Sequence, residues 1–435
     1  MQFPVSKLAA VLGLVLATAA PALTAQQEAY LGAPIHYETE RSEDAVARLR
    51  QRIAAGEVAF EWDEQRGWLP ALLTAFEVPV SSQLLVFSQT SLQADLIGPK
   101  RPRALYFNDE VAMGWIPGAP LIELTVMDPV QGPTFYAVEQ AKRPDPIQRA
   151  DGSCLSCHAG SRTRDLPGNL VRSVHPDADG RPILRSGTDD VTHATPFEKR
   201  WGGWYVTGTH GDMRHRGNAV VRPDDSAGEF VDPEAGANVV ALDGFFDTAA
   251  YLSPHSDLVA LMVLEHQAQM QTVLARASYE GRLAKQYSLE MNAMSGRPAD
   301  FVSASVERRY ASAARRVVQQ LLFFEGVELT APVAGTSAFA KEFEARGVRD
   351  SKGRSLRDFD LQTRLFRHPC SYLIHSSAFD RLPPEVLERV YAQLGAILAA
   401  ADDPVDYPRL TAPVRRELIE MLREVKPGMP AACFD

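Results

Sequence analysis

Two cysteines and a histidine stand together in the pentapeptide Cys154-Leu155-Ser156-Cys157-His158. Two thiols three residues apart, followed directly by an imidazole, form the attachment signal for a c-type haem. The thiols bond to two vinyl groups on one edge of the porphyrin, and the next residue then lies under the iron. Because the chain has no second pentapeptide of this kind, the spacing predicts one covalent haem c, with thioethers from the two cysteines and His158 as an axial iron ligand.

Two other chemistries use closely spaced cysteines, and the surrounding sequence favours neither. A zinc site needs four protein ligands, or three and a water, whereas the remaining cysteines, Cys370 and Cys433, are distant and have no paired spacing. A thioredoxin-like dithiol is expected between a strand and a helix, but residues 142–152 are interpreted as a loop. In an oxidising compartment Cys370 and Cys433 could pair, or both could remain thiols.

The pentapeptide resembles that of c-type cytochromes. Residues 201–211 (WGGWYVTGTHG) and 366–374 (FRHPCSYLI) resemble segments of large secreted bacterial proteins that contain a cytochrome c domain. The resemblance to c-type cytochromes implies haem binding and one-electron transfer. Small cytochromes c have a methionine ligand in a Met-Pro-like context, but Met213, the nearest downstream methionine, has no proline beside it.

The ligand on the other side of the iron separates the possible functions. Electron carriers have six-coordinate iron, whereas catalysts and gas sensors leave the sixth position open or weakly held. His210 is the leading candidate because Gly208 and Gly211 flank it, and small neighbours allow a flat ligand to approach closely. The alternatives are an open position or one of four other side chains: His193, His215, His266 and Met213.

Arginine side chains suit the paired carboxylates that a haem presents as propionates. Four arginines of the haem segment are candidates for this role: Arg172, Arg200, Arg214 and Arg216.

The sequence is consistent with three functions. The leading one is a mono-haem electron carrier, and because the chain is larger than a simple shuttle requires, we expect it to dock with a redox partner protein. The second is a peroxidase-like enzyme with an open distal site, in which a histidine or arginine would handle the protons of peroxide. The third is a haem-based sensor of NO, CO or O₂.

The first 25 residues have the pattern of a cleavable signal peptide, with a basic Lys7, an apolar run over residues 8–20 and small residues up to Ala25. This predicts a periplasmic or secreted protein, which agrees with haem c attachment outside the cytoplasm; a retained N-terminal anchor is the alternative. The rest of the chain has no stretch of membrane-spanning length. A net charge of −10 argues against nucleic-acid binding, which calls for a basic surface.

The pattern along the chain predicts an α+β protein in three parts. Residues 26–140 are expected to form an α+β domain with an antiparallel β-meander, residues 141–245 a loop-rich haem segment, and residues 250–435 a helical region. Strands are expected at residues 84–87, 105–107, 111–116, 121–127, 134–138 and 203–208. Helices are expected at residues 43–54, 68–76, 257–280, 301–324 (ended by Gly326) and 383–398, and after Thr411.

Overall fold

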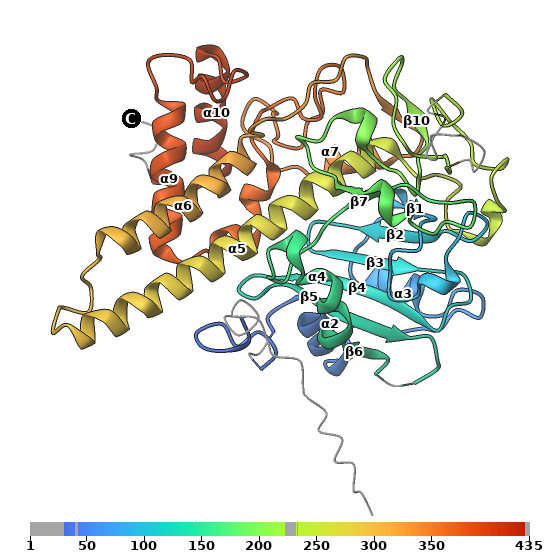
Figure 1. Cartoon of the computed structure of the whole chain (residues 1–435), viewed down its shortest axis with the longest axis horizontal. Coiled ribbons are helices and arrows are strands. Elements are labelled where there is room, and N and C mark those ends of the chain that lie inside the picture. Colours follow the sequence, from blue (N-terminus) through green and yellow to red (C-terminus); the bar gives the residue numbers. More distant parts are fainter. Residues whose placement is uncertain (1–29, 40–41, 144, 222–231, 233, 431–435) are drawn as a thin grey trace, which may run out of the picture.

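The computed structural model describes residues 30–39, 42–143, 145–221, 232 and 234–430. The predicted signal peptide and Cys433 lie outside these residues. Within them, none of the helices combines the length and apolarity needed to cross a bilayer. The α+β class is confirmed, because an antiparallel sheet occupies the N-terminal half and helices predominate toward the C-terminus (Figure 1).

The main sheet has seven strands in the order β6-β5-β4-β3-β2-β1-β9. Its strands are β1 (Leu84–Val86), β2 (Arg103–Phe107), β3 (Val111–Trp115), β4 (Leu121–Asp128), β5 (Gly132–Glu139), β6 (Ile147–Arg149) and β9 (Trp204–Tyr205). The predicted meander is therefore confirmed. The β4–β5 turn needs Gly132, which has a φ of 73° and whose Cβ would lie 2.5 Å from Cβ of Ala275.

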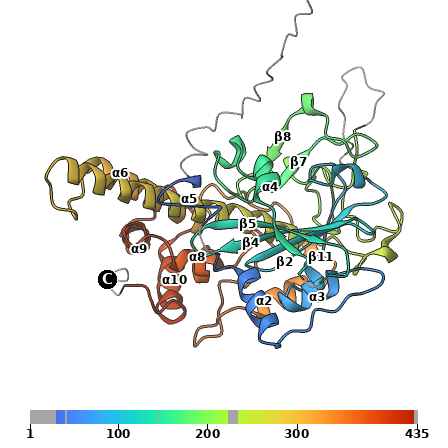
Figure 2. The same ribbon diagram turned by 90° about the horizontal axis from the view of Figure 1, so that it is seen from below.

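The two faces of the sheet differ because side chains alternate along each strand. One face packs against α2 (Ala45–Ala54) and α3 (Leu69–Ala75), and the two form one hydrophobic cluster. The opposite face has a row that runs across four strands, formed by Leu105, Gly114, Glu123 and Ala137. The segment around α4 (Asp151–His158) lies over this second face (Figures 1 and 2).

The longest helix, α5 (Leu258–Met294), joins the sheet to the C-terminal helices. Asp257 caps it by accepting bonds from the amides of Val259 and Ala260. Every residue from Leu258 to Ala268 is buried, because this half lies between the sheet and the C-terminal part of the chain. The other helices are α6 (Ala304–Leu321), α7 (Phe339–Ala345), α8 (Ser377–Asp380), α9 (Pro384–Leu398) and α10 (Ala412–Val425).

The helical region shares one hydrophobic core with the sheet. Phe107 and Met127 from the strands belong to the same cluster as Leu261 of α5 and Val318 of α6. A core of this kind means that the C-terminal helices hold α5, and through it the sheet, in place.

Several predicted boundaries were wrong. The helix predicted for residues 257–280 continues to Met294, and the one predicted for residues 301–324 ends at Leu321. Gly326 does not end it, since Phe323, with a φ of 53°, already turns the chain away. The strand predicted at residues 203–208 is split into β9 and β10 (Gly208–Thr209), because Thr207 bonds instead to the Ser256 carbonyl beside the start of α5.

Short elements complete the fold. β7 (Arg172–Val174) pairs with β8 (Thr188–Asp190), and β10 pairs with β11 (Ala334–Gly335). The 3₁₀ helices are Val80–Ser82, Ala94–Leu96, Ser161–Thr163, Leu184–Ser186, Phe197–Lys199, Thr248–Ala250 and Tyr372–His375.

Candidate cofactor site

Helix α4 carries the whole pentapeptide and follows β6 with only Ala150 between them. The prediction of a loop over residues 142–152 was therefore wrong, because the prolines end at Pro146 and the next three residues pair with β5. A strand leading into a helix is the setting expected of a thioredoxin-like dithiol. The expected loop before the pentapeptide therefore no longer argues against a dithiol.

The position of the thiols within α4 still argues against a dithiol. A redox cysteine is activated at a helix N-terminus, where the helix dipole stabilises the thiolate. Cys154 is the fourth residue of α4, and Cys157 is the seventh of its eight residues. Cys157 therefore lies in the last turn, where the dipole gives a thiolate no support, and its side chain is exposed.

His158 ends α4 and is held by the loop that follows it. Its Nδ1 donates to the carbonyl oxygen of Gly168 at 2.9 Å, while the amide of Gly168 donates to the carbonyl of His158, also at 2.9 Å. A carbonyl can only accept, so Nδ1 carries the proton and Nε2 keeps its lone pair. The loop is tightly packed at Gly168, since a Cβ there would lie 2.9 Å from Cγ2 of Thr272 and 3.0 Å from Cγ2 of Thr163.

Burial keeps the His158 ring neutral. Burial lowers the pKa of His158, the bond to Gly168 acts in the opposite direction, and the charges of Arg103 and Glu123 respectively lower and raise it. The ring also packs against Phe135 with 4.6 Å between centroids. A neutral imidazole with a free Nε2 lone pair is the form that binds a metal ion.

One face of the sheet lies beside His158. Phe135, Arg103 and Glu123 all belong to the face that carries the cross-strand row, in which Gly114 and Ala137 are the small members. A Cβ on Gly114 would lie 3.1 Å from Cδ of Arg103 and 3.2 Å from Cδ2 of Leu105, so side chains lie across this glycine.

Two arginines beside the pentapeptide have buried donors without acceptors. The Nε atoms of Arg103 and Arg172 are both buried and make no hydrogen bond. Burial lowers the pKa of Arg172, as does Arg162, whereas Asp190 and Cys157 raise it, which places Arg172 near the second thiol. Donors left unpaired in this way fit a ligand that brings carboxylates, such as a haem.

Arg103 was missed in the sequence, although one signal pointed to it. It pairs with Glu123 of β4, and both side chains are less than one-fifth exposed. Arg103 and Glu123 belong to the two strands that flank β3, and a charged residue on each of them is a departure from apolar patterning that could have identified this pair.

The other three predicted arginines have carboxylate partners elsewhere. Arg200 forms a buried pair with Glu265, and this carboxylate also accepts a bond from Trp201 at 3.1 Å. Arg214 binds Glu234 at 2.7 Å at the surface, and Arg216 binds Asp189 at 2.5 Å. Only Arg172 of the predicted four is therefore placed beside the pentapeptide.

The structure does not bring His210 together with His158. The segment of His210 touches α5 at Leu258, because a Cβ on Gly208 would lie 2.7 Å from Cβ of Leu258, whereas Gly168 meets α5 at Thr272. These contact points are fourteen residues apart, which is about 21 Å along a helix axis at about 1.5 Å per residue. Two axial nitrogens of one iron are only about 4 Å apart, given metal–nitrogen bonds of about 2 Å.

His210 and His215 instead form their own aromatic group. Their rings are 4.8 Å apart, and each also contacts Phe197. The Nε2 atom of His210 accepts a bond from the amide of Asn238 at 3.0 Å. Met213 is buried in the main hydrophobic core.

His193, in the loop after β8, and His266, in α5, both contact the C-terminal end of α6. The Nε2 atom of His266 is 2.7 Å from the Ser371 hydroxyl, and the ring stacks on Phe323 at 4.5 Å. His193 bonds through Nε2 to the carbonyl of Phe324. Over the described ranges, no three or more histidine, cysteine, aspartate or glutamate side chains are grouped as a metal site.

The last candidate thiol, Cys370, is deeply buried, and burial raises its pKa to about 12. Its possible partner Cys433 lies outside the described residues.

In comparisons with known proteins, no family model, curated protein or solved structure matches the chain.

Proposed function

We propose that this chain carries one haem c on α4 and transfers single electrons through it, as an exported protein. The observation that supports this most strongly is the state of His158. Its Nδ1 proton is held by the Gly168 carbonyl, and its Nε2 lone pair is left available at the end of the helix that carries Cys154 and Cys157.

Each neighbouring group has a role in this proposal. The bond to Gly168 fixes the tautomer of His158 and makes the ring a better donor to iron. Phe135 packs beside the ring, and Arg103 and Arg172 supply donors for carboxylates. A bound haem would supply the Fe(III)/Fe(II) couple. Cys157, which would hold it, is exposed, so a redox partner could dock beside this residue.

The test is a reversible redox titration of protein made with haem-ligation machinery. We expect a single one-electron wave, together with a reduced spectrum typical of haem c, and the C370S variant should behave the same. An absent wave, or a two-electron wave typical of a dithiol, would overturn the proposal.

A second candidate is a haem protein with an open distal site, either a peroxidase-like enzyme or a gas sensor. It is favoured by the distance between His158 and the segment of His210, and by the contacts that hold His266 among Ser371 and Phe323. Addition of CO to the reduced protein distinguishes the two: a rapid Soret shift supports the open site, whereas an unchanged spectrum supports the six-coordinate carrier. Turnover of peroxide would then separate the enzyme from the sensor.

A further inference from the structure

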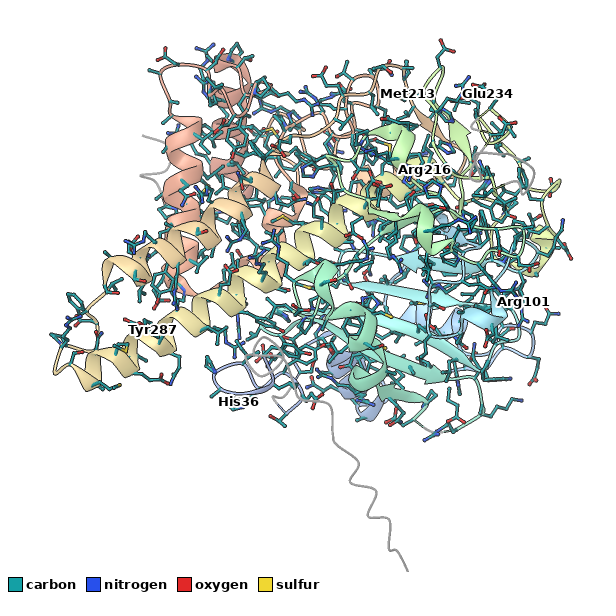
Figure 3. The ribbon with its side chains drawn as sticks, viewed as in Figure 1. His36, Arg101, Met213, Arg216, Glu234 and Tyr287 are labelled. Carbon is teal, nitrogen blue, oxygen red and sulfur yellow. The ribbon has the colours of Figure 1, made fainter. Side chains whose placement is uncertain are left out.

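A cavity lies behind the haem-attachment segment, on the side of the helices. It has a volume of about 350 Å³ and is lined by residues after α4, by α5 and by the C-terminal end of α6. Figure 1 shows α5 and α6 side by side, and Figure 3 draws their side chains as sticks. Ligand cavities in proteins have volumes of about 300–1,000 Å³, so this one is large enough for a small molecule.

Four arginines line this cavity. Arg276 and Arg316 share one carboxylate, Glu280, which Arg276 contacts at 2.7 Å. Arg162 binds Asp190 at 2.9 Å. Among the residues that the structure describes, Arg164 has no carboxylate partner, and Glu325 is a further acidic member of the lining.

Three of the arginines that line the cavity lie close enough to influence one another electrostatically. Burial lowers the pKa of Arg316 and Glu280 raises it, while the charges of Arg276 and Arg164 lower it as well. Only two of these three guanidinium groups, those of Arg276 and Arg316, pair with Glu280. Such an arrangement is stabilised by an added anion, because each guanidinium can give two parallel hydrogen bonds to one carboxylate or phosphate.

Neutral polar side chains also line the cavity, together with apolar ones such as Leu170 and Val273. The Gln320 amide donates to Nδ1 of His193 at 3.2 Å and to Oε1 of Gln269 at 3.1 Å. Burial lowers the pKa of His193 to about 4, with Arg200 and Arg409 lowering it and its bond to the Phe324 carbonyl raising it. His193 is therefore uncharged at neutral pH, and the arginines decide which ligand the cavity accepts.

We propose that this cavity binds the carboxylate or phosphate group of a small anionic ligand through Arg164, Arg276 and Arg316. Such a group could come from two sources, because Arg162 and Arg164 follow the pentapeptide within six residues and so lie near the expected haem as well as lining the cavity. One is a free small anion, and the other is the propionates of the haem itself, in which case the inference rests on the proposed function.

The experiment is calorimetric titration of the full-length holoprotein with succinate and, separately, with inorganic phosphate. We expect binding that weakens at least tenfold in R164Q and in R316Q, whereas R315Q, which changes the exposed neighbour on α6, should bind as the wild type does. Since Arg164 has no ion pair to lose, R164Q should fold normally even if R316Q does not.

The same titrations on the haem-free C154S/C157S variant separate the two sources. Arginine-dependent binding to both forms indicates a free anion, and binding to the haem-free form alone indicates that the propionates occupy the cavity. If neither form shows binding that depends on Arg164 or Arg316, the proposal is overturned. Haem content, measured by absorbance, reports on the proposed function independently.

Discussion

The Nδ1 atom of His158 and the carbonyl oxygen of Gly168 are 2.9 Å apart, although ten residues separate them in sequence. This bond connects the end of α4 to a loop that is itself packed on α5 at Thr272. The orientation of the imidazole is therefore linked to the long helix, whose first eleven residues, Leu258 to Ala268, are all buried.

The first prediction concerns the G168A substitution. A Cβ there would lie 2.9 Å from Cγ2 of Thr272, so the loop must shift and move the carbonyl that holds His158. We expect a loss of about 1–3 kcal/mol in unfolding free energy, typical of overpacking, and a changed reduction potential. Urea denaturation and redox titration measure the two effects.

The matched control for it is G152A, within α4. A Cβ at Gly152 has no atom within 4 Å, and alanine favours a helix over glycine by up to about 1 kcal/mol. We expect this variant to keep the potential and to gain slightly in stability. Equal potentials in G168A and the wild type would contradict the role given to the Gly168 carbonyl.

The second prediction concerns Arg172. Its buried Nε atom has no acceptor, so we expect it to bind a haem carboxylate in the holoprotein. R172Q removes that charge and should shift the reduction potential, while R214Q, whose arginine pairs with Glu234 at the surface, should leave it unchanged. The reverse ranking of the two shifts would show that the carboxylates lie elsewhere.

The third prediction concerns His210. Because its segment meets α5 about 21 Å along the axis from the contact of Gly168, we expect H210Q holoprotein to keep the absorption spectrum of the wild type in both oxidation states. Loss of low-spin bands in H210Q, but not in H266Q, would show that His210 reaches the iron after all.

Much of the fold could be predicted because its elements have strong periodic patterns. The β-meander alternates and ends at turn residues, and Asp257, Pro384 and Thr411 mark helix starts. The helix-to-sheet packing could not be predicted, since the same apolar stripe on α5 would suit either a separate bundle or the shared core. β6 was missed because the prolines before it obscured a strand of only three residues.

The site was predicted only where spacing within one segment carries the information. Cys154, Cys157 and His158 lie on one helix, so their order in the chain suffices to group them. Arg103 comes from a strand about fifty residues away, and only the fold places it beside His158. The distal residue poses the same problem, because choosing among several histidines requires tertiary contacts that local sequence does not contain.

The fourth prediction concerns pH. Burial lowers the pKa of His193 and of His375 to about 4, from an ordinary value of 6.5, and lowers that of His266 well below it. Between pH 6.5 and 4 the unfolded chain binds protons that the folded chain excludes, so stability should fall as the pH falls. Each histidine contributes up to about 1.4 kcal/mol per pH unit.

One buried acid opposes this trend. Burial raises the pKa of Glu265 from 4.5 to about 7, although Arg200 and Trp201 act to lower it. The folded protein therefore binds this proton more tightly than the unfolded chain does. The contribution of Glu265 to the free energy of unfolding falls as the pH rises from 4.5 to 7. Urea unfolding at several pH values should give a shallower slope for H375N than for the wild type, and identical slopes would contradict the assignment of His375.

The central claim is tested most directly by intact-mass and peptide-mass measurement of the protein made with haem-ligation machinery. We predict that the mass increases by one haem, that the added mass lies on the peptide containing Cys154 and Cys157, and that it disappears in C154S/C157S. An unmodified peptide, a disulfide between the two cysteines, or bound zinc at these sulfurs would contradict the account.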